Sequence, residues 1–162
     1  MNKKDIIITR TFDAPIELVW KAWSNSELMS QWWPPAGFSC PLAKIDFREG
    51  GTSLIGMRAP EEMGGGDMYS VMAYKKIVPM EFIEMVVNLA DKDGNIVDPI
   101  SVGMPPEFNK DMRMTVAFKN AGEHKTEMTV TQYDWTISKM FEMAETGLNQ
   151  SLDKMTEILA RG

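Results

Sequence analysis

The side chains best suited to nucleophilic chemistry in this sequence are one cysteine and one histidine, Cys40 and His124. A thiol becomes a nucleophile when a basic partner removes its proton, so the two residues would have to meet in the fold. Cys40 precedes Pro41 and has no basic residue beside it, whereas His124 stands between two charged residues. We therefore interpret Cys40 as a small buried thiol and His124 as a solvated turn residue.

The counts of cysteine and histidine also limit which disulfides and metal sites the chain can form. One cysteine excludes an internal disulfide, and one histidine excludes any zinc site with two imidazole ligands. Asp91, Asp93 and Asn95 have the spacing of the first ligands of a calcium loop. The twelfth position of such a loop, where a glutamate would bind, holds Val102. The sequence therefore predicts a hairpin turn here, with no metal ion and no other cofactor.

Gln132 is the most informative polar residue. It alternates with Met128 and Val130 on one face of a predicted strand, and this apolar face should turn toward the interior. A buried amide without a partner costs about 1 to 3 kcal/mol. A water molecule, the hydroxyl of Tyr74 or a polar group of a ligand could pair with the amide, and these alternatives stay open at this point.

Composition and charge narrow the classes of partner. Of the 162 residues, 17 are basic and 23 acidic, so the formal net charge is -6 and the attraction to phosphate on which nucleic-acid binding depends is missing. Neither a nucleic acid nor a membrane is expected as a partner. The N-terminal apolar run is too short for a secretion signal, and no run approaches the ~18 apolar residues of a membrane span. We expect a cytoplasmic protein with one domain over residues 1–162.

The chain should begin with a strand and two short helices. Residues Asp5–Phe12 are rich in isoleucine and threonine, which favour a strand. Pro15 suits the first position of a helix. Ser24 and Glu27 have the spacing of a capping box, so a second helix is expected from Ser24 to the following pair of prolines.

Alternating apolar and polar residues then predict three pairs of antiparallel strands. The long stretch before the third pair, Asp98–Asn109, is expected to be a loop of the kind that often forms a lid or a binding site. The expected pairs are Ala43–Arg48 with Thr52–Arg58 across Gly50–Gly51, Met68–Val78 with Met80–Leu89 hinged at Pro79, and Met112–Lys119 with Glu127–Gln132.

The last segment, Thr136–Arg161, has the period of a long amphipathic helix. Gly147 interrupts it, which indicates a bend or a close approach of the backbone to another element. An antiparallel sheet must cover its apolar face, and this helix is the only element long enough to do so. The predicted fold class is therefore α+β, with a curved sheet around the helix. The apolar stripe of the helix consists of Ile137, Phe141, Ala144, Leu148, Leu152, Met155 and Leu159.

The segment from Arg10 to Trp33 resembles the opening signature of a known family, the activators of heat shock protein 90 ATPase and their homologues, within the START-like superfamily. Further matches are the turn at Asp46–Gly51, the segment Ile77–Glu81, and Gly147 with the following residues Ser151–Lys154. The matching positions of the opening signature are Arg10, Phe12, Ala14, Pro15, Glu17, Val19, Trp20, Ala22, Trp23, Glu27, Trp32 and Trp33.

This resemblance implies a helix-grip fold, in which a sheet of about six or seven strands leaves a cavity against the C-terminal helix. It does not imply one activity. Members of the wider superfamily bind lipids or polyketides, act as cyclases or hydrolases, or serve as co-chaperone domains, so function has to be argued from the residues.

The leading functional hypothesis is a module that binds an apolar or aromatic small molecule with one polar group. Methionine accounts for 15 of the 162 residues, and its flexible side chain can adapt to different ligands or simply fill a core. Trp20 and Trp23 are interpreted as core residues. The predicted cavity residues are Trp33, Phe47, Met57, Tyr74, Met85, Met114, Phe118, Met128, Gln132, Met140 and Met143.

Three alternatives accompany this hypothesis. A cyclase-like or hydrolase-like enzyme could use the same cavity, with Tyr74 or an acidic residue as the proton donor. A co-chaperone-like domain would instead bind another protein. A homodimer is also possible, because an exposed sheet edge or apolar surface could pair two copies.

Overall fold

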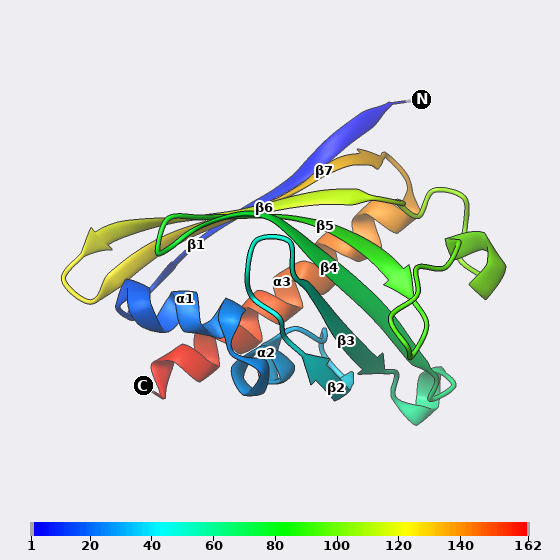
Figure 1. The fold of residues 1–162 in the computed structure, drawn as a ribbon, viewed down its shortest axis with the longest axis horizontal. Helices are drawn as coiled ribbons and strands as arrows, with labels where there is room; N and C mark the ends of the chain where they lie inside the picture. The colour runs from blue at the N-terminus through cyan, green and yellow to red at the C-terminus, as the bar shows by residue number, and fades with distance from the viewer. Residues whose placement is uncertain (1, 162) are drawn as a thin grey trace.

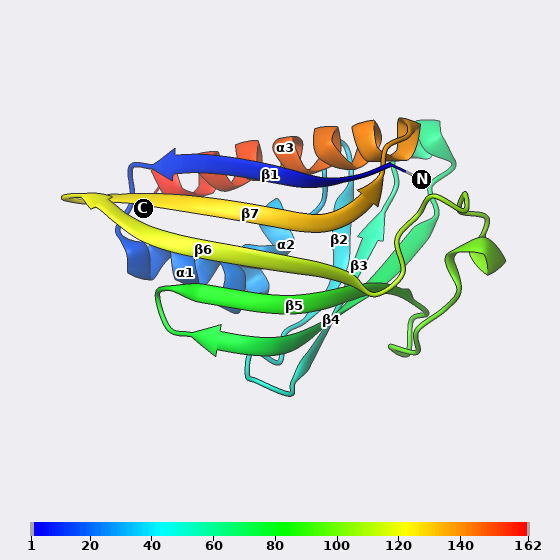
Figure 2. The same ribbon diagram turned by 90° about the horizontal axis from the view of Figure 1, so that it is seen from above.

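The computed structural model describes residues 2–161 and contains one seven-stranded antiparallel sheet that curves around the long helix α3 (Figures 1 and 2). The elements in chain order are β1 (Lys3–Phe12), α1 (Ile16–Ser24), α2 (Ser26–Trp32), β2 (Ser39–Lys44), β3 (Thr52–Arg58), the 3-10 helix η1 (Glu61–Met63), β4 (Asp67–Val78), β5 (Phe82–Ala90), the 3-10 helix η2 (Pro99–Val102), β6 (Met112–Gly122), β7 (Lys125–Thr136) and α3 (Lys139–Ala160).

The strands are arranged in the order β1-β7-β6-β5-β4-β3-β2, so β1 and β2 form the two edges. Strands β2 to β7 follow one another in space as they do in the chain, and β1 joins at the far side by pairing with β7. Helix α3 lies on the concave face of this sheet (Figure 1). Arg10 of β1 donates hydrogen bonds to Asp153 and Asn149 and so joins the first strand to α3.

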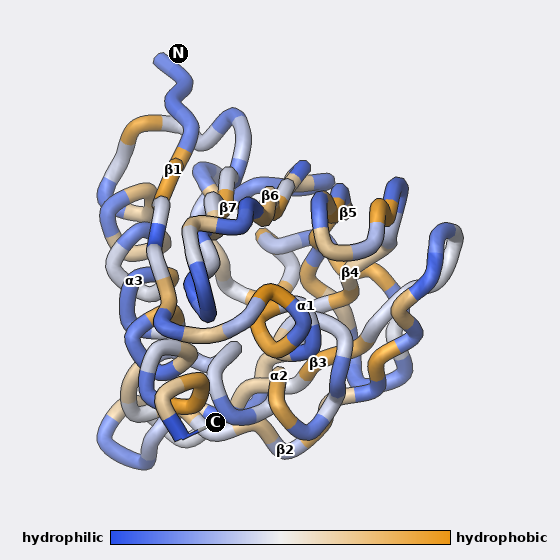
Figure 3. Tube along the Cα trace, turned by 90° about the vertical axis from the view of Figure 1, so that its left-hand side faces the viewer, coloured by the Kyte–Doolittle hydropathy of each residue, from blue (hydrophilic) through white to orange (hydrophobic). Residues whose placement is uncertain are grey.

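Tryptophan residues fill one end of the space between the sheet and α3. Trp23 and Trp32 are almost fully buried and pack edge to face at 4.6 Å between ring centroids. The indole of Trp32 donates to the carbonyl of Ala22, which ties α2 to α1. Figure 3 shows apolar stretches of α1 at the centre of the molecule, with hydrophilic stretches at the peripheral turns and the N-terminus. This end of the molecule is a packed core.

The starts of two helices differ from the sequence prediction. Helix α2 begins after Asn25, whose side-chain oxygen accepts from the backbone N–H of Leu28, whereas the hydroxyl of Ser24 donates back to Trp20. Helix α3 begins only after Ser138, which caps it through the N–H of Phe141. The first difference arises because Asn25 caps α2 in place of Ser24, and the second because Ser138, for which no cap was predicted, caps α3.

Three further boundaries differ. The strand expected to run to Arg48 ends at Lys44, and the following residues form the irregular turn before β3. Ile137, assigned to the apolar stripe of α3, precedes the helix and is 54% exposed. The predicted loop Asp98–Asn109 contains the short helix η2. Asp91 accepts from the backbone of Asp93 and Asn95, and this closes the turn after β5.

Strand β7 contains one extra residue near its end. Ile6 pairs with Gln132 and Lys4 pairs with Trp135, so two steps on β1 correspond to three on β7. Asp134 adopts a positive φ of 59°, and its N–H bonds the carboxylate of Asp5. This β-bulge reverses the alternation of side chains beyond it. Trp135 therefore turns to the buried side of the strand, the side on which Gln132 already lies.

No helix within residues 2–161 is long and apolar enough to cross a membrane.

Candidate functional site

An apolar groove of about 250 Å³ lies between the N-terminal half of α3 and the concave face of the sheet, beyond the tryptophan-filled core. Helix α3 forms one wall, β6 and β7 form the opposite wall, and the segment after α2 together with the end of β3 closes a third side. The lining residues are Trp33, Pro35, Met57, Phe108, Met112, Gln132, Trp135, Met143, Ala144, Gly147, Leu148 and Ser151.

The side-chain amide of Gln132 is the main polar group of this groove. Its oxygen accepts a hydrogen bond of 3.2 Å from the indole N–H of Trp135. An indole N–H can only donate, so the amide oxygen must face Trp135 and the amide NH₂ must face the other way. That NH₂ points to the sulfur of Met114 at 3.6 Å, and sulfur is a weak acceptor. A groove-lining side chain therefore carries a strong donor with a weak partner.

The hydroxyl of Ser151 is the second polar group. Its oxygen lies 2.8 Å from the carbonyl of Trp33 and 3.1 Å from the carbonyl of Gly147, and its single proton is directed to these two acceptors. The oxygen lone pairs remain able to accept. Gln132 and Ser151 thus give the groove one amide donor and one hydroxyl acceptor within otherwise apolar walls.

Four of the eleven predicted cavity residues line this groove: Trp33, Met57, Gln132 and Met143. They come from the end of α2, from β3, from β7 and from α3, so the fold brings together residues that are far apart in the sequence. Seven lie outside the groove, where five are buried in the core and two, Phe47 and Met140, are partly buried against it. The seven are Phe47, Tyr74, Met85, Met114, Phe118, Met128 and Met140.

Aromatic and sulfur contacts explain why several of these seven are enclosed. Trp20 packs against both Phe47 and Phe118, at 5.4 and 5.1 Å between ring centroids. The indole of Trp23 donates to the sulfur of Met128 at 3.1 Å. The tryptophans of α1 therefore occupy the part of the interior where the sequence predicted a ligand.

Tyr74 also belongs to the core. Its hydroxyl lies 2.8 Å from the hydroxyl of Ser53, and its ring packs against Phe47. Burial raises the pKa of Tyr74 to about 12. Of the partners considered for Gln132, Tyr74 is therefore excluded, and the indole of Trp135 takes that place.

Sequence reasoning missed the other lining residues, and the reasons differ. Trp135 reaches the groove only because of the bulge at Asp134, which simple alternation does not reveal. Phe108 comes from the irregular loop before β6, where periodicity gives no direction. Ala144 and Leu148 belong to the apolar stripe predicted for the last helix. That pattern does not distinguish residues that line a groove from residues that pack in the core.

The titratable groups lie elsewhere in the part of the chain that the structure describes. None of the groove-lining side chains among residues 2–161 is titratable, and these residues contain no cluster of three or more possible metal ligands. Cys40 is half-buried in β2 and its thiol donates to the carbonyl of Leu42, while burial raises its pKa. His124 is exposed in the turn between β6 and β7.

Comparison with known families gives a clear result. The model of the family described as "Activator of Hsp90 ATPase homolog 1-like protein" matches residues 13–160. The chain belongs to this family. The resemblance indicated by the segment Arg10–Trp33 is thereby confirmed, and the expected α+β helix-grip fold is confirmed by the sheet around α3. No curated protein matches the chain.

Solved structures of several bacterial proteins share this fold over nearly the whole chain. A protein from Staphylococcus epidermidis is 28% identical with a TM-score of 0.77, and the match covers 99% of this chain and 92% of that one. A protein from Arthrobacter aurescens is 21% identical with a TM-score of 0.80, over 100% and 92% of the two chains. A protein of the same family from Silicibacter pomeroyi is 18% identical with a TM-score of 0.76, over 97% and 98%.

Proposed function

We propose that this protein is a small-molecule binding module that holds a neutral, largely apolar ligand in the groove between the sheet and α3. The observation that carries the proposal is the amide of Gln132, a groove-lining side chain whose NH₂ has only a weak sulfur acceptor. Such a donor gains a stronger bond when a ligand oxygen replaces the sulfur. The ligand therefore carries a hydrogen-bond acceptor.

The chemistry of the walls supports a neutral ligand. A charged group moved into an apolar site without a counter-ion loses its hydration at high cost. The groove offers an amide donor at Gln132 and a hydroxyl acceptor at Ser151, and none of its lining side chains among residues 2–161 is charged. A carbonyl or ether oxygen for Gln132, with a hydroxyl for Ser151 on larger ligands, suits these two groups.

Catalysis is less well supported by the same geometry. A cyclase or hydrolase would need a proton donor or acceptor that touches the substrate. Tyr74, the phenol considered for this role, lies in the core beside Ser53, and its raised pKa of about 12 keeps it protonated. Binding is therefore the function that the groove supports best.

A groove-filling variant tests the proposal. Gly147 lines the groove from the middle of α3, so Gly147→Leu should place an isobutyl group inside it. Thr146→Leu adds a similar side chain at an exposed position one residue earlier and serves as the control. We expect the native chain and Thr146→Leu to bind the neutral dye Nile red, with a blue-shifted and enhanced emission.

For Gly147→Leu we expect binding at least about tenfold weaker, because the dye and the leucine compete for one space. Far-ultraviolet circular dichroism and a thermal melt establish that both variants are folded. Equal dye affinity in all three proteins would place the binding site elsewhere, and no dye uptake by the native chain would count against the binding function.

A further inference from the structure

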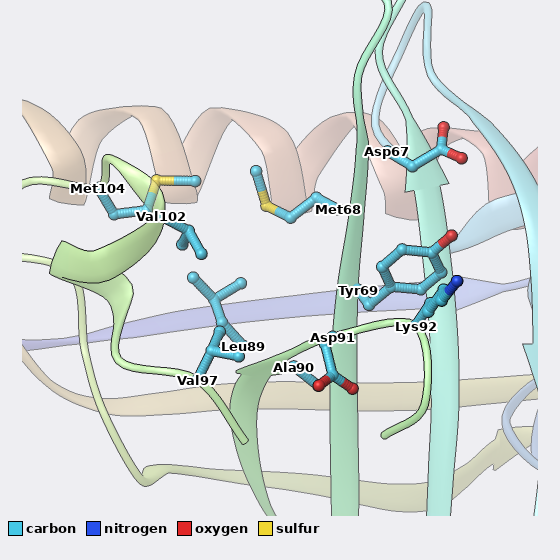
Figure 4. Close-up of a pocket in the computed structure, with 10 residues that line it drawn as sticks. All are labelled: Asp67, Met68, Tyr69, Leu89, Ala90, Asp91, Lys92, Val97, Val102 and Met104. Carbon is cyan, nitrogen blue, oxygen red and sulfur yellow. The ribbon is translucent and has the colours of Figure 1, made fainter. Parts of the chain in front are cut away.

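Three hollows follow one another, each sharing lining side chains with the next. The groove ends at Phe108, Met112 and Trp135, and the same three side chains line a cavity of about 50 Å³ on their other side. Leu89 forms part of this small cavity and also of the hollow of about 360 Å³ drawn in Figure 4. Phe108, Met112 and Trp135 thus lie between the groove and the small cavity, and Leu89 lies between the small cavity and the larger hollow.

Of the three shared side chains, Phe108 is held least firmly. Met112 stands in the ladder between β5 and β6 opposite Val87, and Trp135 is fixed by its hydrogen bond to Gln132. Phe108 belongs to the loop before β6, is half-buried, and packs its ring edge-on against Trp135 at 6.1 Å. Rotating its side chain breaks no strand pairing.

The loop that carries Phe108 is anchored at its ends. Lys110 forms an ion pair of 3.3 Å with Asp98, which joins the two ends of the loop. Asp111 and Asn88 exchange two hydrogen bonds, at 2.7 and 3.0 Å, just before β6. Between these anchors, the N–H of Phe108 bonds the carbonyl of Pro105 in a local turn. The anchors hold the ring of Phe108 at the end of the groove.

The hollow beyond Phe108 continues the apolar surface. In Figure 4, Met104, Val102 and Leu89 lie together on one side of it, with the sulfur of Met68 facing them. The polar residues Asp67, Tyr69, Asp91 and Lys92 lie at its other side. An alkyl chain leaving the groove past Phe108 would first enter the small cavity, and it would have to pass Leu89 to reach these apolar walls.

The length of this path follows from the sheet. The register places Gln132 of β7 opposite Tyr74 of β4, three strand spacings or about 14 Å away, and Met68 lies six residues further along β4, so Gln132 and Met68 are about 24 Å apart. Three bonds of an extended chain advance about 3.5 Å, so about twenty bonds are needed to cross from the amide to the hollow.

We propose that Phe108 determines the length of the ligand: its ring ends the groove, and the site takes straight-chain molecules with a carbonyl at Gln132 and a tail that points at Phe108. This inference rests on the proposed function. Removing the ring joins the groove to the small cavity of about 50 Å³, so that a longer tail is accommodated.

The test is a series of methyl ketones, from 2-heptanone to 2-tetradecanone, that displace Nile red from the native chain and from Phe108→Ala. Each methylene that enters an apolar site strengthens binding by about fourfold. We expect this gain to stop for the native chain when the tail reaches Phe108, and to continue in Phe108→Ala through several further methylenes. Ile100 is an exposed position of the same loop, and in Ile100→Ala the gain in binding should stop at the same tail length as in the native chain.

The outcomes separate the two proposals. If the native chain binds the ketones and Phe108→Ala shows the same limiting length, Phe108 does not determine length and this inference is wrong, while the binding function stands. If neither protein binds any ketone or the dye, both proposals are overturned. A shifted limit in Ile100→Ala would also overturn the inference, because it would assign the effect to the loop as a whole.

Discussion

The indole N–H of Trp135 donates to the side-chain oxygen of Gln132 over 3.2 Å, although three residues of a regular strand would place the two side chains on opposite faces. The bulge at Asp134 brings them together. The bond fixes the orientation of the amide, and the orientation of the amide decides which ligand atom the groove prefers. The chemistry of the site thus depends on one extra residue in β7.

The bond between Gln132 and Trp135 can be measured by a double-mutant cycle. Gln132→Met leaves the indole N–H unpaired, and Trp135→Phe leaves the amide oxygen unpaired, so each should lower the free energy of unfolding by about 1 to 3 kcal/mol. The double variant leaves neither group unpaired, so its loss should be smaller than the sum of the single losses by about 1 kcal/mol or more. Urea unfolding measures all four proteins, and additive losses would show that the bond contributes nothing.

Gly147 should tolerate a small side chain and gain stability from it. A Cβ atom built at this position would lie 3.8 Å from the Cβ of Pro35, which is an ordinary contact. Alanine in a helix interior is favoured over glycine by about 1 kcal/mol, so Gly147→Ala should raise the melting temperature.

Gly51→Ala is the matched control for this prediction. A Cβ there would lie 2.5 Å from the backbone oxygen of Asp46, so this substitution should lower the melting temperature. A lower melting temperature for Gly147→Ala would show that α3 approaches its neighbours more closely than the structure indicates.

Stability should fall at high pH because of Tyr74. Burial raises its pKa from 10.0 to about 12, so the folded protein keeps this proton over a range in which the unfolded chain loses it. The folded state binds more protons there, and the free energy of unfolding therefore decreases as pH rises from 10 to 12, by on the order of 2 kcal/mol.

Tyr74→Phe provides the comparison, since other groups titrate equally in both proteins. The difference in the free energy of unfolding between the native chain and Tyr74→Phe should be constant below pH 10. Above pH 10 it should shift in favour of the variant. A difference that does not change with pH would contradict the buried, protonated phenol.

Much of the architecture could be predicted from the sequence because periodicity reports which side of an element is buried. The two strands predicted on either side of Pro79 are β4 and β5. The residues that alternate from Met112 to Phe118 lie in β6. The long helix α3 was expected as the cover of the sheet and has this place (Figure 2). The start of this helix was predicted too early. Because Ser138 caps it, Thr136 and Ile137 precede the helix.

The site was harder to predict because a residue packed in the core and a residue that lines the groove both point inward. Both therefore produce the same apolar pattern in the sequence. Met85 and Met143 both belong to apolar patterns, yet Met85 is 1% exposed and Met143 is 57% exposed at the groove. The difference arises from how far the tryptophans of α1 and α2 reach along α3. That distance is a tertiary property that no local pattern contains. A ligand and a homodimer remain predictions, as does the cytoplasmic location.

The methionines make the central claim directly measurable, since their methyl groups are resolved by nuclear magnetic resonance in protein labelled with [¹³C-methyl]methionine. Met57, Met112 and Met143 line the groove. A second set is buried in the core and serves as the internal control. The control methionines are Met29, Met72 and Met155.

In a titration with 2-decanone, the three groove methyl signals should shift together along one saturable curve while the three core signals stay in place. Gly147→Leu should abolish these shifts, because its side chain occupies the same space. Saturable shifts confined to other methionines, or no saturable shift at all, would contradict ligand binding between the sheet and α3.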